Sequence, residues 1–160
     1  MVSSSQASTS QPNIPDDIAQ ELSAFNSLTT DDKLGLLWVL YENMGESVTP
    51  AAPGSANTQF TERLYEDVKA MSESDQLAFM RDLVEKKQTE QTKTYGTFVE
   101  NNKLAFWYQL SEGMAAGDII PVPDDYELPS SASKVFTDIT ALDFERQITL
   151  LRHAVLEMGA

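Results

Sequence analysis

Few residues of this 160-residue chain could do acid, base, nucleophilic or metal chemistry. His153 is the single histidine, which excludes histidine-pair metal motifs and di-iron Glu-x-x-His pairs. It precedes Glu157 by one helical turn, and a surface pair is the simpler interpretation. The chain has no cysteine, so thiol catalysis and zinc-thiolate sites are excluded as well. A Gly-x-Ser-x-Gly elbow, a phosphate loop and a dinucleotide fingerprint are missing, and the sequence predicts no enzyme.

Large and soft side chains stand out instead. Trp38 and Tyr41 lie one turn apart, and Trp107 and Tyr108 lie at the matching place in the second half. Four methionines lie at or near the ends of the same kind of segment: Met44, Met80, Met114 and Met158. Aromatic rings supply flat contact area and methionines adapt to irregular shapes, so together they could line a slot for an extended conjugated molecule. Core packing is the alternative, because aromatic stripes at helical spacing are usually core.

The elements that must position these side chains are helices. No segment shows sustained alternation with period two, so we predict an all-α fold with essentially no sheet. Two starts carry capping signals, Thr29 with Asp32 and Ser72 with Asp75. Predicted helices start near residue 14, run from 29 to 45, carry an apolar stripe from 60 to 71, start again at 72, and cover 102–115, 131–141 and 144–158, with a short helix or turn at 90–100.

Four helix starts resemble one another. They read DDKLGLLW (31–38), SDQLAFMR (74–81), NNKLAFWY (101–108) and ERQITLLR (145–152). The first and third lie about 70 residues apart, as do the second and fourth, which predicts a duplicated helical unit. Two such units packed face to face would create a seam, and ligands often bind at such a seam.

The bulk properties limit the partners. A net charge of −14 opposes binding to nucleic acid and to anionic membranes. No stretch approaches a membrane span, and the amino terminus lacks a secretion signal, so we expect a cytoplasmic protein. Residues 1–13 are polar and expected to be disordered, and residues 14–160 are expected to form one helical domain.

The sequence resembles the amino-terminal domain of the orange carotenoid protein and, more closely, the stand-alone helical carotenoid proteins of cyanobacteria. The matching stretches are LLWVLYENMG (36–45), TPAAPGSAN (49–57), KLAFWYQL (103–110) and QITLLRHAVLEMG (147–159). The resemblance implies two interleaved four-helix bundles around a central apolar tunnel. It also implies a keto-carotenoid, canthaxanthin or echinenone, in that tunnel. The protein would then supply binding and orientation, and the pigment would supply the chemistry.

The resemblance also implies which residues contact the pigment. By position, the tunnel contacts are Leu34, Trp38, Tyr41, Met80, Leu104, Trp107, Tyr108, Met114, Val122, Tyr126 and Ile148. Seven further positions complete the predicted carotenoid site: Gly35, Leu37, Leu77, Ser111, Leu151, Val155 and Met158.

One residue is a candidate for partner binding. Arg152 occupies the family position of an arginine that docks to the regulatory domain or to the phycobilisome, although a solvated arginine is the alternative. The surrounding face departs from the family at four positions: Ala24, Arg81, Phe98 and Glu100. These changes and the acidic charge argue against phycobilisome docking.

We therefore expect constitutive quenching of singlet oxygen, because the regulatory carboxy-terminal domain is not part of this sequence. The alternatives are an excitation-energy quencher docked to the phycobilisome and a carotenoid carrier. The expected partners are the carotenoid and either the phycobilisome or a separate carrier protein like the carboxy-terminal domain. The protein would be a monomer or weak dimer in the cytoplasm, with the thylakoid periphery as the alternative location.

Overall fold

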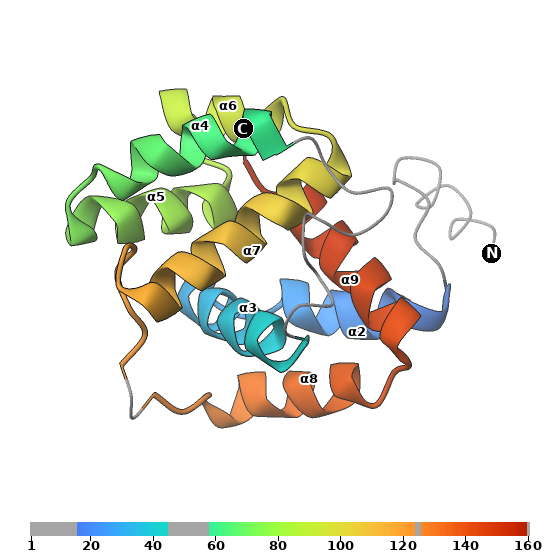
Figure 1. Cartoon of the computed structure of the whole chain (residues 1–160). Coiled ribbons are helices and arrows are strands. Elements are labelled where there is room, and N and C mark those ends of the chain that lie inside the picture. The colour runs from blue at the N-terminus through green and yellow to red at the C-terminus, as the bar shows by residue number, and fades with distance from the viewer. Residues whose placement is uncertain (1–15, 45–57, 124–125, 160) are drawn as a thin grey trace.

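The computed structural model describes residues 16–44, 58–123 and 126–159. Those residues form helices and no strand, so the all-α prediction is confirmed for them (Figure 1). The helices are α2 (Asp16–Asn26), α3 (Thr30–Met44), α4 (Thr58–Lys69), α5 (Glu73–Glu85), α6 (Glu90–Gly96), α7 (Glu100–Ala116), α8 (Ser130–Thr140) and α9 (Phe144–Leu156). The short element predicted at residues 90–100 is the helix α6.

The predicted capping signals begin the helices as expected. The Thr29 hydroxyl accepts a hydrogen bond from the Asp32 amide at 3.2 Å, and the Ser72 hydroxyl accepts one from the Asp75 amide at 3.2 Å. Each bond satisfies a backbone donor that has no partner within the helix. The expectations for disorder in residues 1–13 and for a helix end at Gly45 lie outside the described residues.

The two halves of the chain exchange helices. Helix α3 packs on α5 as α7 packs on α9, and α3 packs on α8 as α7 packs on α4. Likewise α2 packs on α8 and α9, whereas α6 packs on α4 and α5. These four pairs of contacts match between the halves, which agrees with the predicted duplication, whereas the contact of α4 with α5 has no equally close counterpart between α8 and α9. The halves are interleaved, as the resemblance implies, and the simpler expectation of two separate units packed face to face is wrong.

Two four-helix bundles result, one of α2, α3, α8 and α9 and the other of α4, α5, α6 and α7. In Figure 1, α7 and α9 cross the middle of the molecule, with α4, α5 and α6 at one end and α8 at the other. Helix α7 is covered on most of its sides: it buries six consecutive positions, from Asn102 to Trp107, and then Leu110 and Gly113.

No helix in the described part of the chain is both long enough and apolar enough to cross a lipid bilayer.

Candidate functional site

The eighteen residues of the predicted carotenoid site all lie in the described part of the chain. They come from α3, α5, α7 and α9, from Met158 just after α9, and from the segment that links α7 to α8, residues 117–129, which we call the α7–α8 segment. Eight are buried: Leu37, Tyr41, Met80, Leu104, Trp107, Leu151, Val155 and Met158. The other ten keep part of their surface exposed: Leu34, Gly35, Trp38, Leu77, Tyr108, Ser111, Met114, Val122, Tyr126 and Ile148.

The buried members belong to the common hydrophobic core, and partly exposed members such as Leu77, Met114 and Ile148 pack against it. Core packing and pigment contact are therefore compatible for these residues. Trp38 and Val122 lie outside the apolar packing that the described residues form. The partly exposed ring of Trp38 on α3 is an apolar surface available to a ligand.

Two contacts join parts of the predicted site that are distant in sequence. The Tyr41 hydroxyl of α3 donates a hydrogen bond to the Leu104 carbonyl of α7 at 2.9 Å. The Tyr126 side chain lies against α3 at Gly35, where an added β-carbon would be 1.8 Å from the Tyr126 hydroxyl oxygen. Only glycine admits this approach, so Gly35 sets where the Tyr126 ring lies.

Trp107 is fixed by a buried relay of hydrogen bonds. Its indole N–H donates to the Tyr95 hydroxyl at 3.1 Å, and that hydroxyl donates to the Val155 carbonyl at 2.7 Å. Tyr95 itself is fully buried, and its ring contacts those of Phe98 and Phe106. The orientation of the Trp107 ring is thus determined by groups in α6 and α9.

Two tyrosines of the site have raised pKa values. Burial raises the pKa of Tyr41 well above its ordinary value of 10.0. Burial also raises the pKa of Tyr126, and the carboxylates of Asp32 and Asp31 raise it further. The predicted carotenoid site contains no acidic or basic side chain, and such a set of residues fits an elongated apolar group better than a charged one.

Lys103 is a buried cation at the edge of this site. Its ammonium donates to the Leu156 carbonyl at 2.8 Å, where the carbonyl end of α9 favours a positive charge, and it lies 5.2 Å from the centre of the Tyr95 ring. Burial lowers the pKa of Lys103. Among the described residues, no three histidine, cysteine or acidic side chains are placed to hold a metal ion.

Two residues that hold the site were missed by the sequence interpretation. Tyr95 carries no signal in the sequence apart from its aromatic character. Gln76 was visible as the glutamine of the repeated motif, but its hydrogen bonds to the α7–α8 segment follow from the fold alone. Arg152, the predicted partner contact, is partly buried and donates from Nε to the Asn101 side-chain oxygen at 3.2 Å.

Comparison with known proteins gives a consistent result. The family model described as "Orange carotenoid protein, N-terminal" matches residues 11–160. An orange carotenoid-binding domain-containing protein of Nostoc sp. is 45% identical over 144 residues, which are 90% of this chain and 84% of that protein. The orange carotenoid-binding protein of Synechocystis sp. is 38% identical over 144 residues, 90% of this chain but 45% of that protein, so the chain spans about half of this longer relative.

Solved structures are similar over nearly the whole chain. The Anabaena (Nostoc) sp. Red Carotenoid Protein binding canthaxanthin superposes with a TM-score of 0.81 at 35% identity, covering 90% of this chain and 99% of that one. The Orange Carotenoid Protein of the same organism, also binding canthaxanthin, gives a TM-score of 0.81 at 34% identity over 99% of this chain and 52% of that one.

Proposed function

Because the chain belongs to the family of the orange carotenoid protein amino-terminal domain, we propose that it binds a keto-carotenoid, canthaxanthin or echinenone, and protects against light by quenching singlet oxygen. The observation that carries this proposal is the set of partly exposed apolar side chains that α3, α7, α9 and the α7–α8 segment contribute beside a common hydrophobic core. The cytoplasmic location expected from the sequence belongs to the same proposal.

The residues of the chain would bind and orient the pigment. Trp38 from α3 and Tyr108 from α7 keep exposed ring surface that an apolar polyene can cover. The Tyr126 ring is located by Gly35, and the Trp107 ring by Tyr95. When bound, the carotenoid supplies the excited-state chemistry that deactivates singlet oxygen. The protein then needs no acid, base or nucleophile, and the raised pKa values of Tyr41 and Tyr126 keep these two phenols neutral at physiological pH.

Purification from a carotenoid-producing host tests the binding. We expect a strongly coloured protein, and a colourless one would contradict the proposal. Trp38→Ala is expected to lower the pigment-to-protein ratio, because it removes the exposed ring from α3. Phe144→Ala is the matched control, since Phe144 is another aromatic residue, 50% exposed, outside the predicted carotenoid site. Equal pigment retention in the two variants would remove Trp38 from the site.

The decay of singlet-oxygen luminescence tests the photoprotective part. The coloured protein should shorten this decay well beyond the colourless protein at the same concentration. If the two proteins shorten it equally, the chain binds pigment for another purpose, and quenching is refuted while binding stands.

Docking to the phycobilisome is a second candidate function, and Arg152 favours it. Its partner Asn101 is an uncharged amide, and no acidic side chain of the described residues pairs with Arg152, so within that part of the chain its positive charge is available to an acidic partner. Val99, at the start of the same helix as Asn101, is 65% exposed. Fluorescence of isolated phycobilisomes with and without the coloured protein decides between the functions: a loss of fluorescence that Arg152→Gln abolishes would support docking, and no loss at low salt would reject it.

A further inference from the structure

Gln76 makes hydrogen bonds with three parts of the fold at once. Its side chain is only 2% exposed. The amide nitrogen donates to the Val68 carbonyl at 3.1 Å and to the Met71 carbonyl at 3.3 Å, both at the end of α4. The amide oxygen accepts from the backbone N–H of Ile120 at 2.7 Å. Through one side chain, α5 is therefore connected both to the preceding helix and to the α7–α8 segment.

The α7–α8 segment is held at two places. At its start, Gly117 adopts a left-handed conformation, with φ of 89°, and the Ile119 amide donates to the Gly113 carbonyl at 3.1 Å before Gln76 binds Ile120. Toward its end, the Tyr126 ring lies against Gly35 of α3. Val122 and Tyr126, the two residues of this segment in the predicted carotenoid site, follow the first attachment.

We infer that Gln76 is a positioning residue of the carotenoid site: through Ile120 it fixes the start of the α7–α8 segment and so places Val122 and Tyr126 against the pigment. This inference rests on the proposed function. Gln76 does not itself touch the pigment, because its amide group is buried and engaged with backbone groups. The side chain of Gln76 bonds instead to the end of α4 and to the α7–α8 segment. Because its buried amide oxygen accepts a short hydrogen bond from the Ile120 N–H, it closely defines the position of Ile120.

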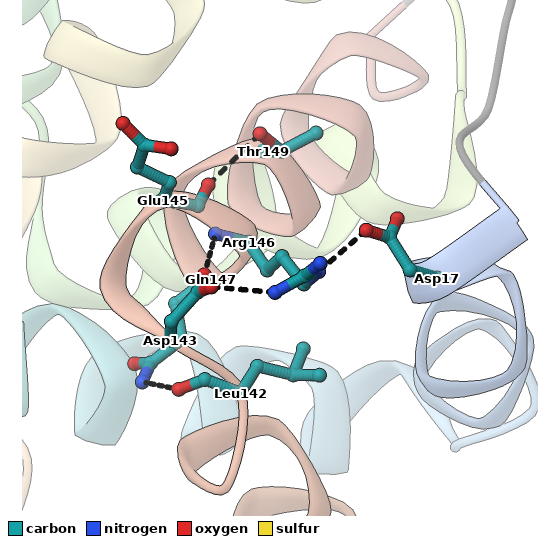
Figure 2. Close-up of polar contacts among 7 residues, drawn as sticks. All are labelled: Asp17, Leu142, Asp143, Glu145, Arg146, Gln147 and Thr149. Carbon is teal, nitrogen blue, oxygen red and sulfur yellow. Dashed lines mark hydrogen bonds and ion pairs between the residues drawn. The ribbon is translucent and has the colours of Figure 1, made fainter.

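The duplication of the chain provides a matched control. Gln147 occupies the equivalent place at the start of α9, and its amide nitrogen donates to the Leu142 carbonyl at 2.8 Å, at the end of the preceding helix (Figure 2). Gln147 thus repeats the bonds of Gln76 to the helix before it, without a bond to the α7–α8 segment among the described residues. Each glutamine also directly precedes a residue of the predicted site, Leu77 or Ile148, so a disturbance of the neighbour would affect both variants.

The test compares Gln76→Met with Gln147→Met in the coloured, full-length protein. Methionine keeps the size of the side chain and removes its hydrogen bonds. We expect Gln76→Met to shift the visible absorption band and to release pigment roughly tenfold faster, within the range typical of energetic coupling between sites. We expect Gln147→Met to lower the thermal stability but to keep the absorption band and the pigment release rate of the wild type. Hydrogen exchange at the Ile120 amide should accelerate in the first variant alone.

A measurement on the wild type keeps the inference testable if Gln76→Met does not fold. Coupling is reciprocal, so if the Gln76–Ile120 bond holds the pigment, then bound pigment must slow exchange at the Ile120 amide. Equal exchange in the coloured and colourless wild type would overturn the inference. So would wild-type spectra and release rates in a folded Gln76→Met variant. A wild-type chain that takes up no carotenoid would instead refute the proposed function, and the role of Gln76 with it.

Discussion

Two arginines lie at equivalent places in the two halves of the chain but have different partners. Arg81 of α5 binds the carboxylate of Asp31 with two N–H groups, at 2.9 and 3.1 Å. Arg152 of α9 donates to Asn101, which is the second residue of α7 as Asp31 is the second residue of α3. The carboxylate neutralises Arg81, whereas the amide orients Arg152 without neutralising it. The same backbone arrangement thus accommodates a closed ion pair in one half and an available charge in the other.

In the interior, it is the second half that has the additional polar contact. At the offset of 70 residues, Tyr95 and Trp107 of the second half correspond to Phe25 and Leu37 of the first, and all four are buried. Only the second half therefore contains the relay from the indole N–H through the Tyr95 hydroxyl to Val155. The comparison teaches that a duplicated backbone can keep buried residues at matching places without keeping their volumes or their polar contacts. The predictions below alter these differences one at a time.

The largest effect is expected from Tyr95→Phe, which gives the second half the residue type of the first. The change leaves the Trp107 N–H buried without its acceptor, and the Val155 carbonyl keeps only its hydrogen bonds from backbone N–H groups, such as that of Met158 at 3.3 Å. We expect the free energy of unfolding to fall by about 2–3 kcal/mol, because buried polar groups without partners are costly. Urea unfolding of the colourless protein measures it. Tyr41→Phe, which breaks one buried bond, should cost less, about 1–2 kcal/mol, and a larger loss there would contradict the comparison.

The same two tyrosines predict a dependence on alkaline pH. Burial raises the pKa of Tyr41 and of Tyr95, and for Tyr95 the neighbouring Tyr41 adds to the rise while the Trp107 hydrogen bond opposes it. The unfolded chain releases these protons near the ordinary value of 10.0, before the folded chain does. The free energy of unfolding is therefore full below pH 10 and falls above it, by about 1.4 kcal/mol per pH unit for each tyrosine.

Urea titrations at a series of pH values measure that slope. The variant with both Tyr41→Phe and Tyr95→Phe should lose most of it, because Tyr65 and Tyr126 are only partly buried. A stability that stays constant as the pH rises above the ordinary tyrosine pKa would show that the two phenols ionise as easily in the folded chain as in the unfolded one.

A third prediction concerns Gly35, whose counterpart in the second half is Ala105. Gly35→Ala places a β-carbon where the Tyr126 hydroxyl lies, so the ring must withdraw. The ring end of one side chain can move, and alanine favours the helix by about 1 kcal/mol, so we expect little net change in stability. We expect a shifted absorption band of the bound pigment, because Tyr126 is displaced.

Gly117→Ala is the matched control for Gly35→Ala. A β-carbon at Gly117 meets no atom within 4 Å, but its φ of 89° strains any other residue. The variant should lose about 1 kcal/mol of stability and keep the absorption band. The opposite pattern, with the band changed by Gly117→Ala and not by Gly35→Ala, would separate Tyr126 from the pigment.

Much of the fold could be predicted from the sequence, because helix periodicity and capping are local. Thr29 and Ser72 cap their helices as predicted, and the repeated motifs predicted the duplication. The exchange of helices between the halves could not be derived from these local signals, since it depends on which apolar face meets which, and only the family resemblance implied it.

The candidate site was predictable in part for the same reason. Trp38 and Trp107 were visible from their size and spacing. The relay through Tyr95, the contact of Tyr126 with Gly35, and the bond of Gln76 to Ile120 join residues 12 to 91 positions apart, and each depends on tertiary packing that no local pattern specifies.

A smaller effect is expected at the helix starts. Thr29 caps α3, but its counterpart Val99 begins α7 with no side-chain hydrogen bond and is 65% exposed. Val99→Thr should raise the free energy of unfolding by about 0.5–1 kcal/mol, because its hydroxyl can accept from the first turn of α7, and Thr29→Val should lower it by a similar amount. Thermal unfolding measures both. A loss of stability on Val99→Thr would mean that the exposed valine packs on the chain in a way that a threonine cannot.

The smallest effect is expected for the arginines, and its dependence on salt is the informative part. Asp31→Asn gives the first half the uncharged partner of the second, so Arg81 loses its ion pair and keeps at most one hydrogen bond. Both side chains are largely exposed, and such pairs contribute little that salt does not screen. The thermal midpoint should therefore fall slightly at low salt and hardly at all at high salt.

Arg152→Gln should change the thermal midpoint equally at low and at high salt, because the bond of Arg152 to Asn101 involves a neutral group. A salt-dependent loss for Arg152→Gln would mean that an acid pairs with Arg152, and the charge on which docking to an acidic partner relies would then already be neutralised within the chain.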